Sequence, residues 1–159
     1  MRRPERRHSP ARAAVFNLPV RVYYQDTDAG GVVFHGTYLD YFERARTEWL
    51  RCLGFDLRRL AERDRTLFIV RELRATYARP ALLDDLLSVT VGVEHVGRAQ
   101  FTLAQQVLRG EELLVEASVN LACVDSIGFR PVRVPEALLD TLLEPPGGPQ
   151  RSAATEEQA

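Results

Sequence analysis

Between residues 18 and 54 the hydrophobic pattern changes from a period of two to a helical period. In the segment LPVRVYY, Val20, Val22 and Tyr24 alternate with Arg21 and Tyr23, which predicts a β-strand with one buried face. After the glycines that follow, apolar residues recur at three- and four-residue intervals, as on one side of a helix. These residues are Tyr38, Tyr41, Phe42, Ala45, Trp49, Cys52 and Leu53.

Both ends of this helix have sequence signals. Gly54 follows the last apolar residue and predicts the helix end, because glycine readily takes the positive φ of a C-terminal cap. Thr37 and Asp40 have the spacing of a capping box, which predicts Thr37 as the N-cap. Two shorter helices are predicted over residues 56–64 and 135–143, the second beginning with a proline.

Four strand-like segments fill most of the second half of the chain, over residues 66–80, 86–97, 98–110 and 112–126. Apolar residues alternate at positions 89, 91 and 93 and again at 101, 103 and 107, with Gln105 in the same register. A turn at residues 109–111 joins the last two strands, and so short a connection favours antiparallel neighbours. One strand, a long helix and four strands predict an α+β fold in which an antiparallel sheet curls around the helix.

The length of 159 residues predicts one domain. Residues 1–16 are rich in arginine and proline and residues 144–159 in proline, glycine and small polar residues, so we expect two disordered tails around a domain at 17–143. The net charge of −1 disfavours a nucleic-acid partner. Without a signal peptide or an apolar run of about 18 residues, the sequence predicts a cytoplasmic protein with no membrane insertion.

Cysteine, lysine and histidine restrict the possible chemistry. Cys52 and Cys123 lack CxxC spacing and are expected to be buried, reduced thiols. All 21 basic residues are arginine, so a lysine nucleophile or Schiff base is excluded. His8, His35 and His95 have no metal-ligand spacing, so neither a metal nor another cofactor is expected.

The segment QDTDAGGVVFH places two carboxylates, Asp26 and Asp28, after the first strand. A calcium loop would need a glutamate at its twelfth position, but counting from Asp26 that position is Thr37. An aspartyl-phosphate phosphotransferase would place such a pair on a parallel sheet of alternating strands and helices, which this chain lacks. Both interpretations are therefore disfavoured.

Two further interpretations fit the segment better. Aspartate side chains bond nearby backbone in turns, and Gly30 and Gly31 supply positive φ, so a turn accounts for part of the motif, including Asp26. His35 and a helix N-terminus follow at once, and the amides there suit a carbonyl oxygen that acquires negative charge. A carboxylate just upstream can attack the same carbonyl or activate water, which is acyl transfer without a catalytic serine.

Three segments carry a resemblance to a known family: VRVYYQDTDAGGVVFHGTYLDYFERARTEWLRCLGFD, FIVRELRATYARPALLDDLLSV and CVDSIGFRPVRVP. Over about residues 18–138 the chain resembles the hotdog-fold acyl-CoA thioesterases of the 4-hydroxybenzoyl-CoA thioesterase class. Within that class it is most similar to the branch encoded beside the Tol-Pal cell-envelope genes. The resemblance implies a five- or six-stranded sheet around a long helix, subunits paired sheet edge to sheet edge with active sites at the interface, and homodimers or homotetramers.

The resemblance also implies roles for single residues. Asp28 matches the catalytic carboxylate, and whether it is nucleophile or general base is left open. His35 matches the position whose backbone amide polarises the thioester carbonyl, with contact of its imidazole to substrate or Asp28 as a further alternative. Gly31 and Tyr38 belong to the same motif and are expected at the oxyanion and substrate site, Tyr38 packing in the core or lining the acyl pocket. Arg98 is the candidate for the phosphates of coenzyme A.

The function implied is hydrolysis of acyl-CoA to a free acid and CoA, with acyl carrier protein as a possible second carrier. The alternative is a non-catalytic protein that binds acyl carriers or serves as a scaffold in phospholipid synthesis or at the cell envelope. The motif residues Glu43, Arg44 and Arg46 are expected to form a solvated or inter-subunit charged cluster. Acyl chain length and the choice between dimer and tetramer are not predicted.

Overall fold

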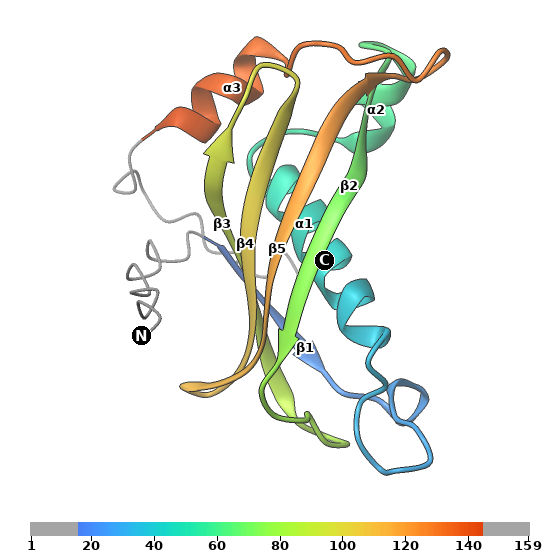
Figure 1. Cartoon of the computed structure of the whole chain (residues 1–159), viewed down its shortest axis with the longest axis vertical. Helices are drawn as coiled ribbons and strands as arrows, with labels where there is room; N and C mark the ends of the chain where they lie inside the picture. Colours follow the sequence, from blue (N-terminus) through green and yellow to red (C-terminus); the bar gives the residue numbers. More distant parts are fainter. Residues whose placement is uncertain (1–15, 145–159) are drawn as a thin grey trace, which may run out of the picture.

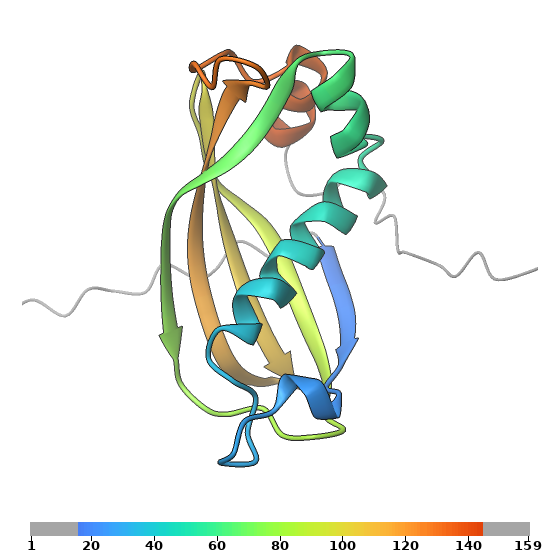
Figure 2. The same ribbon diagram turned by 90° about the vertical axis from the view of Figure 1, so that its right-hand side faces the viewer.

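A five-stranded antiparallel sheet curves around one long helix in the computed structural model, which describes residues 16–144 (Figures 1 and 2). The α+β class predicted from the sequence is therefore confirmed. The elements in chain order are β1 (Phe16–Arg21), the 3-10 helix η1 (Tyr24–Asp26), α1 (Thr37–Cys52), α2 (Leu57–Glu62), β2 (Thr66–Tyr77), β3 (Leu86–Val96), β4 (Gln100–Arg109), β5 (Glu112–Asp125) and α3 (Glu136–Leu143). Both predicted tails fall almost wholly outside the described residues.

The strands are ordered β1-β3-β4-β5-β2. The two hairpins β3–β4 and β4–β5 form the centre of the sheet, and the predicted turn between β4 and β5 contains Gly110 at φ +61°. At the edges, β1 pairs with β3 and β2 pairs with β5, both antiparallel. Because β2 and β3 are consecutive but not paired, residues 78–85 must carry the chain across the end of the sheet.

Helix α1 packs its apolar stripe against the concave face of the sheet (Figure 2). Tyr41, Phe42 and Ala45 are fully buried, as the helical period predicted. Burying a side chain of the size of phenylalanine contributes about 2–3 kcal/mol relative to exposure. Phe101 and Leu103 from β4 are also fully buried, because alternate residues of a strand point to the same face. The predicted apolar stripe of α1 and the alternation of β4 are thereby confirmed at these positions.

Three local predictions about element ends were wrong. Helix α1 has Gly36 as its N-cap with no side-chain cap, so Thr37 is already helical and forms no capping box. Tyr24 is 82% exposed instead of buried, because the strand ends at Arg21 and the chain turns into η1. Pro135 is the N-cap of α3 and not its first residue.

The expected cluster of solvated charges on α1 is only partly correct. Glu43 and Arg44 are exposed, whereas Arg46 is buried beneath the helix. Its Nη1 donates a 2.9 Å hydrogen bond to Oε1 of Gln105, whose Nε2 donates in turn to the Phe42 carbonyl at 3.1 Å. Burial lowers the pKa of Arg46, although Glu43 opposes that effect.

Both cysteines are free thiols, as predicted, with Cys123 buried and Cys52 half-buried. Burial raises the pKa of Cys123 to about 11. Among the helices within residues 16–144, none has the length and hydropathy required to span a membrane.

Candidate active site

The motif with the two aspartates lies in the segment between β1 and α1, at one end of the sheet (Figures 1 and 2). Thr27 and Val33 form an isolated antiparallel bridge. The Asp28 amide donates to the Val32 carbonyl at 2.9 Å, and the Gly31 amide donates to the Asp28 carbonyl at 3.0 Å. These bonds fold the motif into a small hairpin with Asp28 at its turn, where Gly31 adopts φ +76°.

The side chain of Asp28 is exposed and partly held. Its Oδ1 accepts the Gly30 amide at 2.8 Å, the bond of an Asx turn. A Cβ on Gly30 would lie 3.1 Å from that same oxygen, so glycine leaves the carboxylate its space. Within residues 16–144 the second oxygen, Oδ2, has no hydrogen-bond partner. Asp28 is thus oriented by one oxygen and presents the other to solvent.

Asp26 has the structural role that the turn interpretation predicted. It is only 7% exposed, and its Oδ2 accepts the Tyr23 amide at 2.8 Å. Its carbonyl accepts the Phe34 amide at 2.9 Å. The latter bond closes residues 26–34 into a loop with Asp28 inside it.

The start of α1 supplies the donors. The His35 carbonyl accepts the Tyr77 hydroxyl at 2.9 Å, and Gly36 follows as N-cap. In the part of the chain that the structure describes, the amides of His35 and Gly36 donate to no protein group. Unpaired amides at a helix N-terminus attract negative charge. The arrangement therefore places free donors close along the chain to the Asp28 loop.

The imidazole of His35 is exposed and packs against Phe34, with the ring centroids 4.2 Å apart and the ring planes tilted by 47°. No hydrogen bond joins it to Asp28 among the described residues. Tyr38 takes the core position among its two predicted placements, being 2% exposed. Its hydroxyl accepts the Ala81 amide at 2.9 Å, and burial raises its pKa.

Aromatic residues are exposed around this loop, and of these the sequence had placed only Tyr23 on the polar side of the predicted strand. Tyr24, Tyr23 and Phe34 are 82%, 62% and 46% exposed. The alternation had placed Tyr24 in the core, and only the turn-forming tendency of Asp26 signals that the strand stops before it. Apolar surface beside a carboxylate suits an apolar acyl group.

Arg98 does not join the other predicted site residues within one chain. It lies in the connection between β3 and β4, at the opposite end of the sheet from residues 22–36 (Figure 1). There its carbonyl accepts the Val134 amide at 2.9 Å. Strand β3 runs the length of the sheet away from the motif, which explains the separation. Gly31 bonds to Asp28, and His35 follows the same loop, whereas Tyr38 is buried in the first turn of α1.

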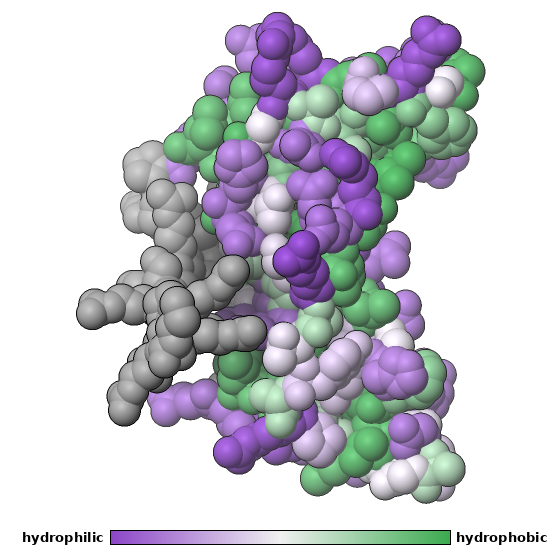
Figure 3. All heavy atoms as spheres, viewed as in Figure 1, coloured by the Kyte–Doolittle hydropathy of each residue, from purple (hydrophilic) through white to green (hydrophobic). Residues whose placement is uncertain are grey.

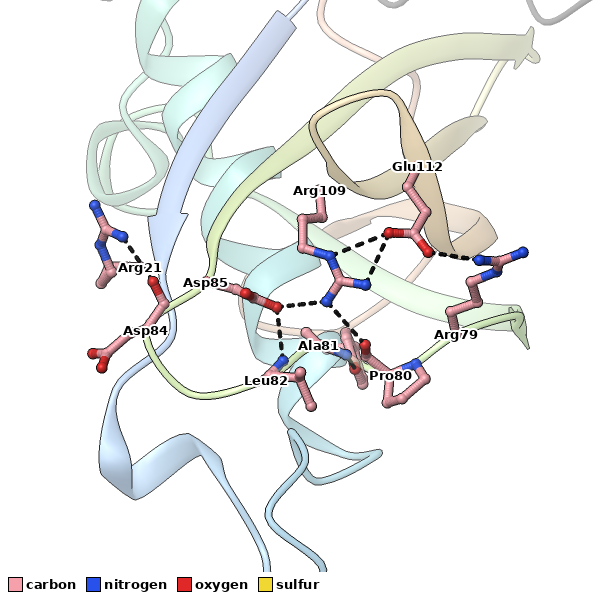
Figure 4. A network of polar contacts seen from close by, with 10 residues as sticks. Arg21, Arg79, Pro80, Ala81, Leu82, Asp84, Asp85, Arg109 and Glu112 are labelled. Atoms are coloured by element: carbon pink, nitrogen blue, oxygen red, sulfur yellow. Dashed lines mark hydrogen bonds and ion pairs between the residues drawn. The ribbon is translucent and has the colours of Figure 1, made fainter.

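A network of charges that the sequence did not reveal supports residues 78–85 beside the site (Figure 4). The Arg109 guanidinium contacts Asp85 at 2.7 Å and Glu112 at 2.8 Å, and Arg79 contacts Glu112 at 2.9 Å. Although burial opposes it, the Leu82 amide and then Arg109 lower the pKa of Asp85. These ion pairs hold residues 78–85 in place next to the motif.

Two backbone contacts link that connection to the motif. The Val33 amide donates to the Ala81 carbonyl at 3.0 Å, and Val32 bridges Leu82. The motif therefore lies against an ordered, charge-braced segment rather than standing free in solvent.

The face of the sheet turned away from α1 is largely hydrophilic (Figure 3) and has a groove of about 570 Å³. It is lined by Arg71, Glu72, Arg74, Glu94, Gln100, Thr102, Ser118 and Asn120. Arg71 donates to Gln100 at 3.0 Å, and Arg74 pairs with Glu72. Because its arginines are already bonded to neighbours within the groove, it is a weaker anion site than the start of α1.

The chain is similar to known thioesterases. Residues 30–116 match the family model described as the thioesterase superfamily. The acyl-CoA thioesterase YbgC of Haemophilus influenzae is 47% identical over 121 residues, which cover 76% of this chain and 89% of the relative. The acyl-CoA thioester hydrolase YbgC of Escherichia coli O6:H1 is 40% identical over 126 residues, covering 79% and 93%. A crystal structure of a probable thioesterase from Bartonella henselae superimposes with a TM-score of 0.72 at 38% identity, covering 75% of this chain and 98% of that one.

Proposed function

The chain belongs to the thioesterase superfamily, and from this premise we propose that it is an acyl-CoA thioesterase that releases a free acid and CoA. It has the hotdog fold and is a thioester hydrolase. The observation that carries the proposal is the exposed Asp28 carboxylate, held by the Gly30 amide in a loop that leads directly into the unpaired amides of His35 and Gly36.

The thioester carbonyl oxygen is polarised by the His35 amide, with the Gly36 amide beside it. Donors that are already oriented stabilise the negative charge of a tetrahedral intermediate without having to reorganise. The dipole of α1 adds to this effect, because its positive end lies at the same place. The acyl group lies against the exposed aromatic residues around the loop.

Asp28 supplies the attack on the carbonyl carbon, by one of two routes. As a general base it removes a proton from water, and the resulting hydroxide adds to the carbonyl before the CoA thiolate leaves. As a nucleophile it forms an acyl anhydride with loss of the thiolate, and water then hydrolyses that anhydride. The single free oxygen of the carboxylate serves either route, since the other is bonded to Gly30.

A second copy of the chain completes the substrate site in this proposal. Strand β2 is an edge strand with exposed Ile69 and Val70, and exposed edges favour pairing with another strand. Two-fold pairing along β2 is antiparallel, so the Arg98 end of one copy comes beside the Asp28 end of the other. In the homodimer, Arg98 of one copy can then contact the phosphates of CoA bound at Asp28 of the other copy. Such dimers can pair further into tetramers.

The setting proposed for the enzyme is the cytoplasm, where acyl-CoA is formed and used. Acyl carrier protein is the proposed second carrier, and the likeness to the Tol-Pal-associated branch supports a role linked to the envelope. A non-catalytic carrier-binding or scaffold role is the alternative, and it requires no intact Asp28.

The test is thiol release from a series of acyl-CoA esters, short aliphatic, benzoyl and long-chain, by the wild type and Asp28→Asn. Asparagine can still accept the Gly30 amide, so the fold is retained while turnover falls by about 10²–10⁴-fold. Asp140→Asn, an exposed carboxylate on α3 and away from the β2 edge, is the matched control and keeps wild-type turnover.

Full activity of Asp28→Asn would show that the carboxylate is not catalytic. Absence of turnover in the wild type with every ester would reject acyl-CoA as substrate. Acyl carrier protein thioesters and carrier binding would then be measured.

A further inference from the structure

Tyr41 has a buried hydroxyl that the folded chain leaves without a partner. The residue lies in the first half of α1 and is fully buried. Within residues 16–144, its hydroxyl is the one buried side-chain polar atom that makes no hydrogen bond. Buried hydroxyl groups in native proteins nearly always form a hydrogen bond, so one without a hydrogen bond needs an explanation.

The candidate partner for the Tyr41 hydroxyl is the carboxylate of Asp26. Asp26 is 7% exposed and is the last residue of η1, where the loop 26–34 begins. Its Oδ2 accepts the Tyr23 amide, and its carbonyl accepts the Phe34 amide. A carboxylate can accept several hydrogen bonds. Among the described residues, the Asp26 carboxylate accepts only one, from the Tyr23 amide.

Two features place the Tyr41 hydroxyl near Asp26. Aromatic side chains of a helix point back toward its N-terminus, so the Tyr41 hydroxyl is directed at the loop that precedes α1. Burial raises the pKa of Tyr41, and the Asp26 carboxylate is the next cause in the same direction.

We propose that Tyr41 donates a hydrogen bond to Asp26 and that this buried pair positions residues 26–34, the proposed catalytic loop, on helix α1. Asp28 lies two residues after Asp26, and the His35 amide follows the Phe34 amide that Asp26 holds. The pair therefore sets where the attacking carboxylate lies relative to the oxyanion donors. Both are positioning residues, because neither reaches the substrate. The inference rests on the proposed thioesterase function.

The experiment compares Tyr41→Phe, Asp26→Asn and the double variant with the wild type in steady-state hydrolysis of the best acyl-CoA substrate. Loss of position affects the transition state more than ground-state binding, so we expect kcat to fall by on the order of 10-fold or more while KM changes little. The double variant falls no further than the more impaired single variant, because both changes break the same contact.

Leu138→Ala is the control for lost stability. Leu138 is fully buried on α3, at the far end of the sheet, so the variant unfolds more easily yet keeps wild-type kcat at a temperature where it is folded. Tyr41→Phe keeps the ring in the core and remains testable if Asp26→Asn fails to fold.

Wild-type kcat in Tyr41→Phe, or effects of the two single variants that multiply in the double variant, would overturn the inference. The proposed function fails separately, through absence of turnover in the wild type. The coupling of the two residues is also measured without any substrate, as non-additive shifts of the urea unfolding midpoint in the same four proteins.

Discussion

The hydroxyl of Tyr77 donates a 2.9 Å hydrogen bond to the carbonyl oxygen of His35. Tyr77 is the last residue of edge strand β2, and its ring also packs edge-on against Tyr38 at 5.6 Å. In a trans peptide the carbonyl and the following N–H point in opposite directions. By holding the His35 carbonyl, Tyr77 therefore sets the direction of the Gly36 amide at the start of α1.

Tyr77→Phe removes this hydrogen bond and leaves the ring in place. A single hydrogen bond contributes about 0.5–1.5 kcal/mol, so we expect kcat for thioester hydrolysis to fall roughly 3- to 10-fold. Thr76→Val is the matched control, since it removes an exposed hydroxyl from the neighbouring position of β2 and should leave kcat unchanged. Equal rates for Tyr77→Phe and wild type would mean that the bond does not orient the amide.

Gly31→Ala tests the backbone of the catalytic loop. A Cβ there meets no atom within 4 Å, so its cost comes only from φ +76°, about 1–2 kcal/mol for an alanine. Asparagine tolerates this conformation better, and Gly31→Asn should be the more stable of the two in urea unfolding. If both variants unfold like the wild type, the loop has relaxed to another conformation, and hydrolysis rates will show whether Asp28 moved with it.

Gln105→Leu tests the buried bond to Arg46. The guanidinium loses its only side-chain acceptor among the described residues, and we expect a loss of about 2–3 kcal/mol in the free energy of unfolding. The double variant with Arg46→Met should recover most of that loss, because it removes the buried charge as well. Gln106→Leu, on the outer face of the same strand, provides the control and should change stability by about 0.5 kcal/mol at most.

The stability of the protein should decrease above pH 9. Burial raises the pKa of Cys123 from 9.0 to about 11, so the folded state holds its thiol proton more tightly than the unfolded state. The resulting stabilisation is fully present below pH 9 and disappears as the pH rises toward 11, a loss of about 2 kcal/mol. Buried Tyr38 acts in the same direction at higher pH, since its pKa is also raised. Cys123→Ala should flatten unfolding free energies measured between pH 9 and 10, and an unchanged slope would assign the effect to other groups.

The main helix and the strands could be predicted because the hydrophobic residues of each recur with one dominant period. The stripe from Tyr38 to Trp49 and the alternation around Phe101 depend only on local spacing, and the structure confirms both. Their ends were less predictable. Whether Gly36 or Thr37 caps α1 depends on the direction in which the loop 26–34 enters the helix, and a bond between Asp26 and Phe34 fixes that direction.

Other features depend on contacts between distant segments, which the sequence does not reveal. Arg46 is charged and was expected at the surface, but its burial depends on Gln105, which lies on another element. Arg98 was chosen as a candidate from a resemblance alone, and its distance from Asp28 follows from the direction of β3, which no local pattern encodes. The loop 26–34 was proposed as catalytic from its residue types, whereas the ion pair between Asp85 and Arg109 that supports it was not predicted.

The order of the strands also constrains when the site can form during synthesis. Strand β1 is made first, but its partner is β3, and Phe16 must wait for Val91 before it can pair. The hairpins from β3 to β5 close over short distances along the chain and are expected to form early. The catalytic loop lies between β1 and α1, so it acquires its final shape only after the later half of the chain has left the ribosome. A nascent chain interrupted before β3 is complete therefore carries every residue of the DTDAGG motif and no working site.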